Sequence, residues 1–122
     1  MKKAVLLILI FAISVVLIAC SAQQSTPEVD AFAKCLSEKG TKMYGAYWCA
    51  HCAKQKKMFK SSFEFIDYVE CDPKGKNPQT DLCLELNIES YPTWIFSDGK
   101  RLVSEIEFEM LAKYSGCEYQ VV

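Results

Sequence analysis

Two cysteines, Cys49 and Cys52, are separated by two residues and lie where a helix is expected to begin, directly after a predicted strand. The unpaired N–H groups and the partial positive charge of a helix N-terminus favour the thiolate form of the first sulfur. Because the thiolate is the attacking species in thiol–disulfide exchange, Cys49 is predicted to be an exposed nucleophile. Cys52 comes one helical turn later, where it is expected to be shielded and to resolve a mixed disulfide.

His51 lies between the two cysteines and is the one histidine of the chain. An imidazole beside the pair can donate a hydrogen bond to the Cys49 thiolate or add positive charge. Either effect stabilises the reduced form and makes the disulfide more oxidising. Zinc would need two further ligands, so no metal site is expected. Copper carriage by Cys49, Cys52 and His51 stays open because thiolates suit Cu(I), and an inert disulfide is the remaining alternative.

The segment Tyr91-Pro92-Thr93 follows a predicted helix and opens a predicted strand. Proline makes a cis peptide bond accessible at a cost of about 0.5–1 kcal/mol. In combination with the upstream redox pair, the segment resembles the place where thioredoxin-fold proteins have a cis proline beside the active disulfide, and this resemblance implies a cis bond before Pro92. Tyr91 and Pro92, with Trp48, are then expected to contact the substrate. A trans proline at the start of an edge strand is the alternative.

The cysteines outside the redox pair and downstream of the N-terminal segment are Cys35, Cys71, Cys83 and Cys117. Sequence alone allows several pairings among them. We expect Cys71–Cys83 to close the Pro/Gly-containing loop between them and Cys35–Cys117 to join the two ends of the domain. A second redox relay at Cys71 and Cys83 is the competing hypothesis.

The elements that position these residues follow from hydrophobic periodicity and turn residues. Apolar residues at helical spacing and strand-like composition predict helices over residues 28–39, 49–59, 80–86 and 106–114, and strands over 42–47, 65–70, 92–97 and 101–104. Asp98-Gly99 predicts a tight hairpin turn between the last two strands. This order predicts an α/β fold with a central mixed sheet of about four strands and helices on both faces.

Finer expectations concern two of these helices. On the helix over 49–59, the solvated side is expected to carry Lys54, Gln55 and Lys57. On the helix over 80–86, the candidate core residues are Leu82, Leu84 and Leu86.

The N-terminal segment has the features of an export signal. Lys2 and Lys3 precede an apolar stretch over residues 4–19, and Leu17-Ile18-Ala19-Cys20 resembles the lipobox of bacterial-type lipoproteins. We expect a signal peptide over 1–19, a lipidated Cys20 with a tether to residue 27, and the folded domain over 28–122. An uncleaved membrane anchor is the alternative, and both place the domain outside the cytoplasm, where disulfides persist.

Length and charge exclude other classes of protein. With 122 residues the chain has room for one domain, and its formal net charge of -1 lacks the basic field that nucleic-acid binding requires. We therefore expect no nucleic-acid partner.

Three motifs resemble the thioredoxin superfamily over roughly residues 28–117: Tyr47-Trp48-Cys49-Ala50-His51-Cys52, Tyr91-Pro92-Thr93-Trp94 and Asp98-Gly99. The run over 43–52 and Ser115-Gly116-Cys117 are most similar to the thioredoxin-like, DsbA-type domains fused to or paired with bacterial homologues of vitamin K epoxide reductase. The match to DsbA itself is incomplete, because Ala50 replaces its proline.

The resemblance implies a monomeric, cofactor-free thiol–disulfide oxidoreductase that oxidises or isomerises the thiols of exported proteins. It implies reoxidation by the quinone-linked membrane enzyme. The lipobox-like segment in turn implies a lipid-anchored position at the cell membrane, facing the periplasm or the extracellular side. One departure concerns proton transfer. Thioredoxins carry a buried acid six residues before the first cysteine, where this chain has Met43. Glu70 could substitute, although we expect it to be a solvated carboxylate at a strand end.

Overall fold

The computed structural model describes residues 1–3 and 24–120. The expected signal peptide, the lipidation at Cys20 and the first part of the tether lie outside these residues. Among the described residues, no helix is long and apolar enough to cross a membrane.

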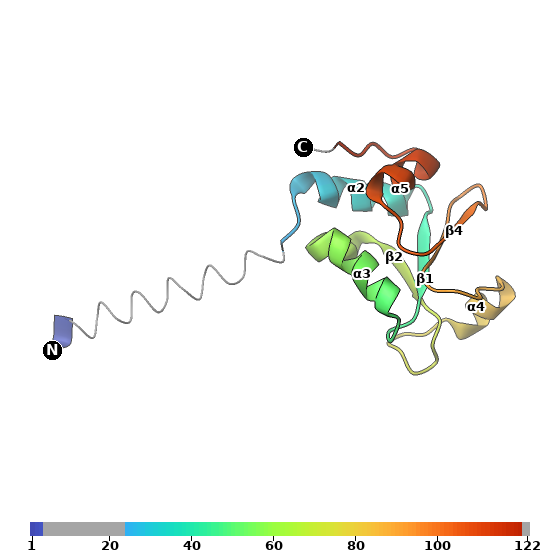
Figure 1. The fold of residues 1–122 in the computed structure, drawn as a ribbon, viewed down its shortest axis with the longest axis horizontal. Helices are drawn as coiled ribbons and strands as arrows, with labels where there is room; N and C mark the ends of the chain where they lie inside the picture. The colour runs from blue at the N-terminus through green and yellow to red at the C-terminus, as the bar shows by residue number, and fades with distance from the viewer. Residues whose placement is uncertain (4–23, 121–122) are drawn as a thin grey trace.

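The core of the fold is a four-stranded sheet in the order β2-β1-β3-β4 (Figure 1). The strands are β1 (Lys42–Gly45), β2 (Asp67–Glu70), β3 (Thr93–Ile95) and β4 (Arg101–Val103). β1 pairs with β2 in parallel and with β3 in antiparallel fashion, and β3 and β4 form an antiparallel hairpin. The predicted α/β class with a mixed sheet is confirmed, and the arrangement is thioredoxin-like.

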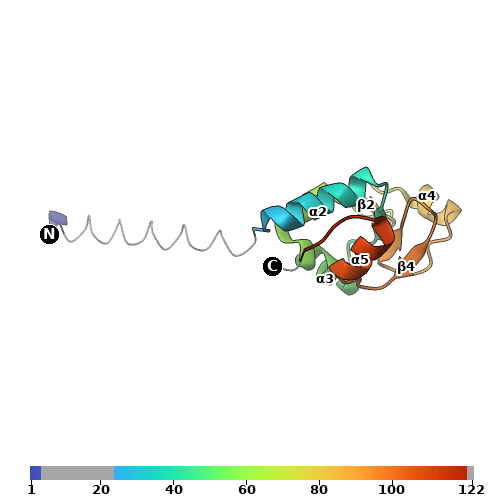
Figure 2. The same cartoon turned by 90° about the horizontal axis from the view of Figure 1, so that it is seen from above.

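Helices cover both faces of this sheet. The helices are α2 (Pro27–Glu38), α3 (Ala50–Phe59), α4 (Thr80–Glu85) and α5 (Phe108–Ser115). α2, α3 and α5 share one core, where Phe32 and Phe59 both pack against Phe108 at ring-centroid distances of 5.5 and 4.6 Å. α4 covers the other face, where Cys83 joins a smaller cluster with Tyr44 and Val69. Figures 1 and 2 show α4 apart from the other three helices.

Several boundaries differ from the prediction because local backbone geometry ends the elements early. Phe65, predicted at the start of the second strand, instead ends the 3₁₀ helix η2 (Lys60–Phe65), which follows α3 directly. The expected burial of Leu84 is wrong, because 69% of this residue is exposed. Cys83 occupies the buried side of the short helix α4 instead, since its disulfide holds that side against the sheet.

Two disulfides tie the chain together, and they are the pairings preferred from the sequence. Cys35 on α2 is joined to Cys117 just after α5, and Cys71 just after β2 is joined to Cys83 on α4. Cys49 and Cys52 carry free thiols. The two disulfides belong to different core clusters and therefore brace opposite sides of the sheet.

Candidate active site

The two free cysteines of the described residues, Cys49 and Cys52, lie at the junction between β1 and α3. A turn closed by a hydrogen bond from the Cys49 amide to the Ala46 carbonyl, at 3.0 Å, leads from the strand into the helix. Cys49 is the N-cap of α3, and its Sγ accepts a hydrogen bond from the Cys52 backbone N–H at 3.1 Å. The first sulfur thus takes the place of a capping oxygen and uses one of the free N–H groups at the helix end.

The two thiols are both enclosed. Cys52 is shielded as predicted, with 1% of the residue exposed, whereas the expectation that Cys49 is exposed is wrong, since only 6% is accessible. Cys49 is enclosed because its sulfur turns inward to cap the helix and approaches the Tyr91 carbonyl. Burial, followed by the hydrogen bond with Cys49, raises the pKa of the Cys52 thiol to about 12.

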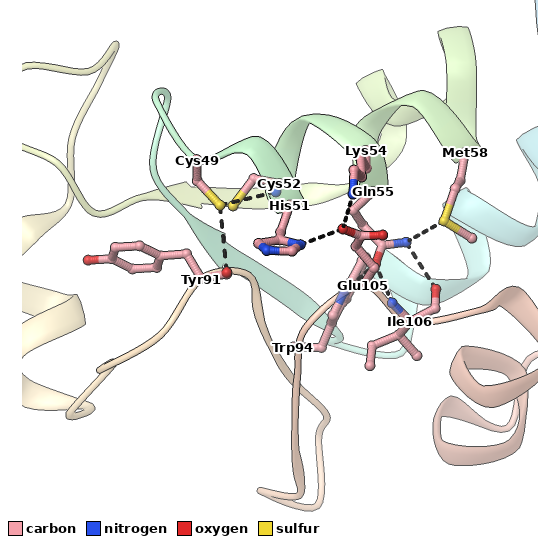
Figure 3. A network of polar contacts seen from close by, with 10 residues as sticks. All are labelled: Cys49, His51, Cys52, Lys54, Gln55, Met58, Tyr91, Trp94, Glu105 and Ile106. Atoms are coloured by element: carbon pink, nitrogen blue, oxygen red, sulfur yellow. Dashed lines mark hydrogen bonds and ion pairs between the residues drawn. The ribbon is translucent and has the colours of Figure 1, made fainter.

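The loop before β3 lies against the first sulfur. The Tyr91–Pro92 peptide bond is cis, as expected, and the Cys49 thiol lies 3.6 Å from the Tyr91 carbonyl oxygen (Figure 3). Pro92 itself is buried.

Aromatic side chains flank this position. The rings of Trp48 and Tyr91 meet edge to face with their centroids 6.0 Å apart, and the Trp48 indole N–H donates to Asp72 at 2.8 Å. Trp48 is 60% exposed. The structure therefore brings together the three residues predicted to contact the substrate, and their role stays a prediction.

His51 has a partner that the sequence did not indicate. Its Nδ1 lies 2.6 Å from Glu105 Oε1, and Lys54 Nζ approaches the same oxygen at 3.6 Å. Figure 3 shows the imidazole directed at this carboxylate, which comes from the segment between β4 and α5. The hydrogen bond with His51 is the main cause that lowers the pKa of Glu105. Of the two effects expected of His51, a hydrogen bond to Cys49 or an added charge, the first is not found, since the imidazole is hydrogen-bonded to Glu105.

Gln55 corrects the expected orientation of α3. It was predicted on the solvated side, but it is fully buried. Its Oε1 accepts from the Ile106 N–H at 2.6 Å and from the Trp94 indole at 3.3 Å, and its Nε2 donates to the Ile106 carbonyl at 3.0 Å. These bonds replace the water that a polar side chain loses on burial. They also fix the segment that carries Glu105.

Glu70 is a second correction, because it is buried and not a solvated strand-end carboxylate. Its Oε1 accepts from the backbone N–H groups of Tyr47 and Asp72, at 3.2 and 2.9 Å. Its Oε2 accepts from the Tyr68 hydroxyl at 2.9 Å. The loop after β2 encloses the carboxylate, since a β-carbon on Gly75 would lie 2.4 Å from Glu70 Cγ.

Met43, at the position where thioredoxins carry a buried acid, is a fully buried core residue on β1. Sequence analysis did not identify Tyr68 or Glu105, because neither lies in a recognisable motif. Among the described residues there is no group of three or more His, Cys, Asp and Glu side chains that could hold a metal ion.

Comparison with curated proteins finds a relative that is a thiol-disulfide oxidoreductase by name. Over 99 residues the chain is 43% identical to the protein named Thiol-disulfide oxidoreductase LTO1 of Arabidopsis thaliana. The alignment covers 78% of this chain but 26% of LTO1, so the chain spans about a quarter of the length of the curated relative it matches. No protein-family model matches the chain.

Proposed function

We propose, from the premise that this chain is a homologue of part of a thiol-disulfide oxidoreductase, that it is itself a thiol–disulfide oxidoreductase that oxidises or isomerises protein thiols. The observation that carries the proposal is the pair of free thiols at the N-terminus of α3, with the first sulfur between the Cys52 amide and the Tyr91 carbonyl. In this arrangement Cys49 is the more accessible of the two cysteines, at 6% against 1% for Cys52, and the Tyr91 carbonyl lies beside its sulfur.

The reaction is a sequence of sulfur exchanges. A substrate thiolate attacks Cys49 Sγ of the Cys49–Cys52 disulfide, and Cys52 leaves as a thiolate that takes up a proton. A second substrate thiolate then attacks the substrate sulfur of the mixed disulfide, and Cys49 is released. The substrate has lost two electrons and gained a disulfide, and the chain is reduced to the dithiol. For isomerisation, the exchange starts from the reduced chain: the Cys49 thiolate attacks a substrate disulfide and releases one substrate thiolate. Another substrate thiolate then attacks the substrate sulfur of the mixed disulfide, so that a different substrate disulfide forms and Cys49 is released without net oxidation.

Cys49 is the nucleophile and Cys52 the resolving cysteine in this proposal. Trp48, Tyr91 and Pro92 form the substrate-contact surface, since Trp48 is exposed and Tyr91 presents its carbonyl beside the reacting sulfur. A substrate backbone that lies along this loop would be placed with its cysteine near Cys49.

His51 tunes the reduction potential through its charge. Glu105, at 2.6 Å from the imidazole, stabilises the protonated ring, and a positive charge one residue before Cys52 favours the reduced pair. The ion pair is exposed on the His51 side, where 62% of the side chain is accessible, so its effect is expected to weaken with salt.

The location and partners form part of the same proposal. The lipobox-like segment ending at Cys20 supports export and a lipid anchor at the cell membrane, and the two disulfides are consistent with an oxidising compartment. The resemblance to domains that work with vitamin K epoxide reductase homologues supports such a quinone-linked enzyme as the electron acceptor.

Trapping of mixed disulfides tests the proposal. After reaction with unfolded proteins that contain disulfides, the Cys52→Ser chain should accumulate Cys49-linked mixed disulfides, visible on non-reducing gels, because the Cys49 thiolate displaces one substrate sulfur and no Cys52 thiol remains to resolve the bond. The Cys49→Ser chain is the matched control and should trap none. Equal trapping by both variants, or by neither, would contradict the assignment.

The reduction potential separates this proposal from the alternatives. An exchange-active pair should equilibrate with a glutathione buffer, whereas a potential below about −300 mV would indicate a structural disulfide. If the reduced chain instead retained stoichiometric Cu(I) against a competing chelator and exchanged no thiols, the copper-carrying alternative would replace the oxidoreductase.

A further inference from the structure

The Cys52 thiol must lose a proton whenever it attacks a disulfide, and it lies where water cannot easily take that proton. The residue is 1% exposed, and burial is the main cause that raises its pKa to about 12. At neutral pH the thiol is therefore protonated, and a buried base is needed for rapid attack.

The Tyr68 hydroxyl and the Cys52 sulfur both border the place that a side chain on Gly45 would occupy. A β-carbon on Gly45 would lie 2.9 Å from Cys52 Sγ and 3.2 Å from Tyr68 Oη. Gly45 fills none of this space, so the phenol and the thiol face it from β2 and α3. Burial is also the main cause that raises the pKa of Tyr68, so the phenol is neutral and can pass on a proton without carrying charge.

Glu70 is the acceptor at the end of a path that leads from the Cys52 thiol through the Tyr68 hydroxyl. The Tyr68 hydroxyl donates to Glu70 Oε2 at 2.9 Å, which is the direction needed to move a proton away from the thiol. The two backbone N–H groups bind the other oxygen, Oε1, which leaves Oε2 to Tyr68 alone among the partners found in residues 24–120. Glu70 is 5% exposed, so it is a buried carboxylate two residues from the phenol on the same strand.

We propose that Tyr68 and Glu70 form the proton relay of Cys52. In the resolving step, Cys52 Sγ attacks Cys49 Sγ of a mixed disulfide between Cys49 and a partner. The Cys49–Cys52 bond forms, the Cys49–partner bond breaks, and the partner sulfur leaves with the electron pair as a thiolate. The Cys52 proton passes to Tyr68 Oη while the Tyr68 proton passes to Glu70 Oε2. The oxidant is the partner disulfide. The inference rests on the proposed oxidoreductase function and adds the residues that carry the proton.

Other charged or titratable groups face this path. The Nζ of Lys56, on α3, lies 3.9 Å from the centroid of the Tyr68 ring, and its positive charge lowers the pKa of Cys52. The charge of Cys49 at the N-cap of α3 raises the pKa of Cys52. Burial raises the pKa of Tyr91, before β3, and the charges of Asp72, after β2, and of the two cysteines raise it further. The positive charge of Lys56 lies beside the phenol. It favours negative charge on the Cys52 thiolate and the Glu70 carboxylate, and it offsets the repulsion between these two groups.

Stopped-flow reaction of the reduced full chain with one equivalent of dithiobis-nitrobenzoate tests the relay. Cys49 should release the first thionitrobenzoate, and Cys52 should release the second when it resolves the mixed disulfide. Tyr68→Phe and Glu70→Gln should leave the first release unchanged and slow the second about 10²-fold at neutral pH, as expected when a general base is lost. The second rate should then rise about tenfold per pH unit, because only the Cys52 thiolate reacts, whereas the wild-type profile should be flatter.

Tyr44→Phe is the matched control, since it removes another buried phenol on the neighbouring strand, within the cluster on the opposite face of the sheet. It should leave both releases unchanged. If Tyr68→Phe retains the wild-type second rate and pH profile, the relay is wrong while the oxidoreductase stands. If Tyr68→Phe loses both releases by misfolding, Glu70→Gln decides by the same criterion. A wild-type chain that gives no first release overturns the proposed function itself.

Discussion

At the scale of single residues, the site separates two chemically similar thiols by their surroundings. Cys49 caps the helix and approaches the Tyr91 carbonyl, whereas Cys52 is buried beside Gly45 and Tyr68. In the proposed function, the same side-chain chemistry serves attack at one position and resolution at the other. Burial of a neutral thiol also makes the stability of the reduced chain depend on pH.

The first prediction concerns that dependence. Because burial and the Cys49 hydrogen bond raise the pKa of Cys52 from 9.0 to about 12, folding favours the protonated thiol. This stabilisation is complete below the unfolded pKa and is lost as the pH rises through the folded pKa. The free energy of unfolding of the reduced chain should thus fall relative to that of the oxidised chain between about pH 9 and pH 12.

Urea denaturation at a series of pH values measures this difference. The reduced Cys52→Ser chain is the control and should follow the oxidised chain, because both lack the buried thiol. A constant difference between the reduced and oxidised wild-type chains over this range would contradict the prediction.

The second prediction concerns Gly45. A methyl group there would approach Cys52 Sγ to 2.9 Å and Tyr68 Cε2 to 3.0 Å, which is closer than non-bonded atoms pack. Gly45→Ala should therefore cost about 1–3 kcal/mol of unfolding free energy and slow the second thionitrobenzoate release. In a Tyr68→Leu background the same substitution should cost less, since the ring atoms are gone, and equal costs in both backgrounds would argue against this contact.

At the scale of elements, the contact between α3 and the segment before α5 determines the surroundings of His51. Gln55 binds both backbone groups of Ile106, and Ile106 follows Glu105 directly. One buried amide on α3 thereby holds the carboxylate against the imidazole one turn earlier on the same helix. A shift of α3 would therefore also change the contact between His51 and Glu105.

The third prediction tests that contact. Gln55→Leu keeps the volume but leaves the Ile106 backbone and the Trp94 indole without these partners. The unfolding free energy should fall by about 2 kcal/mol or more, since each buried group left unpaired costs about 1–3 kcal/mol. Lys57→Leu on the exposed side of α3 is the control and should change it by less than about 0.5 kcal/mol in urea denaturation. Similar losses in both variants would contradict the role of Gln55.

At the scale of the whole molecule, the two disulfides stabilise a small domain from opposite sides of its sheet. Cys35–Cys117 connects residues 82 apart in sequence, whereas Cys71–Cys83 connects residues 12 apart. The longer closed loop removes more conformational freedom from the unfolded chain. The two links should therefore differ in their contribution to stability.

The fourth prediction compares them. In the chain-entropy model, replacing both Cys35 and Cys117 with Ala should cost about 4 kcal/mol, and replacing Cys71 and Cys83 about 3 kcal/mol. Guanidinium denaturation of the two double variants against the wild type measures this order. The Cys71/Cys83 variant should also retain thionitrobenzoate release, and loss of release in a folded variant would support the competing redox-relay hypothesis for that pair.

Local patterns in the sequence were sufficient for the redox pair, the strand–helix junction that holds it, the cis bond before Pro92 and the two preferred disulfides. Each depends on residues close together in the chain or on residue types with few alternatives. A cysteine at a helix start carries its geometry with it, whereas the cis proline followed from the resemblance of its segment to thioredoxin-like proteins. The α/β class followed for the same reason, because periodicity reports element type.

Tertiary structure alone decided which side chains surround the thiols. Glu105 meets His51 across 54 residues of sequence, and Gln55 meets Ile106 across 51. The burial of Glu70 and the position of Tyr68 beside Cys52 depend on how β2, α3 and the loop after β2 pack together. The same type of polar residue can lie on the solvent-exposed surface or in the interior, where hydrogen bonds satisfy its polar atoms. Which of the two applies is decided by packing between segments that are distant in the sequence.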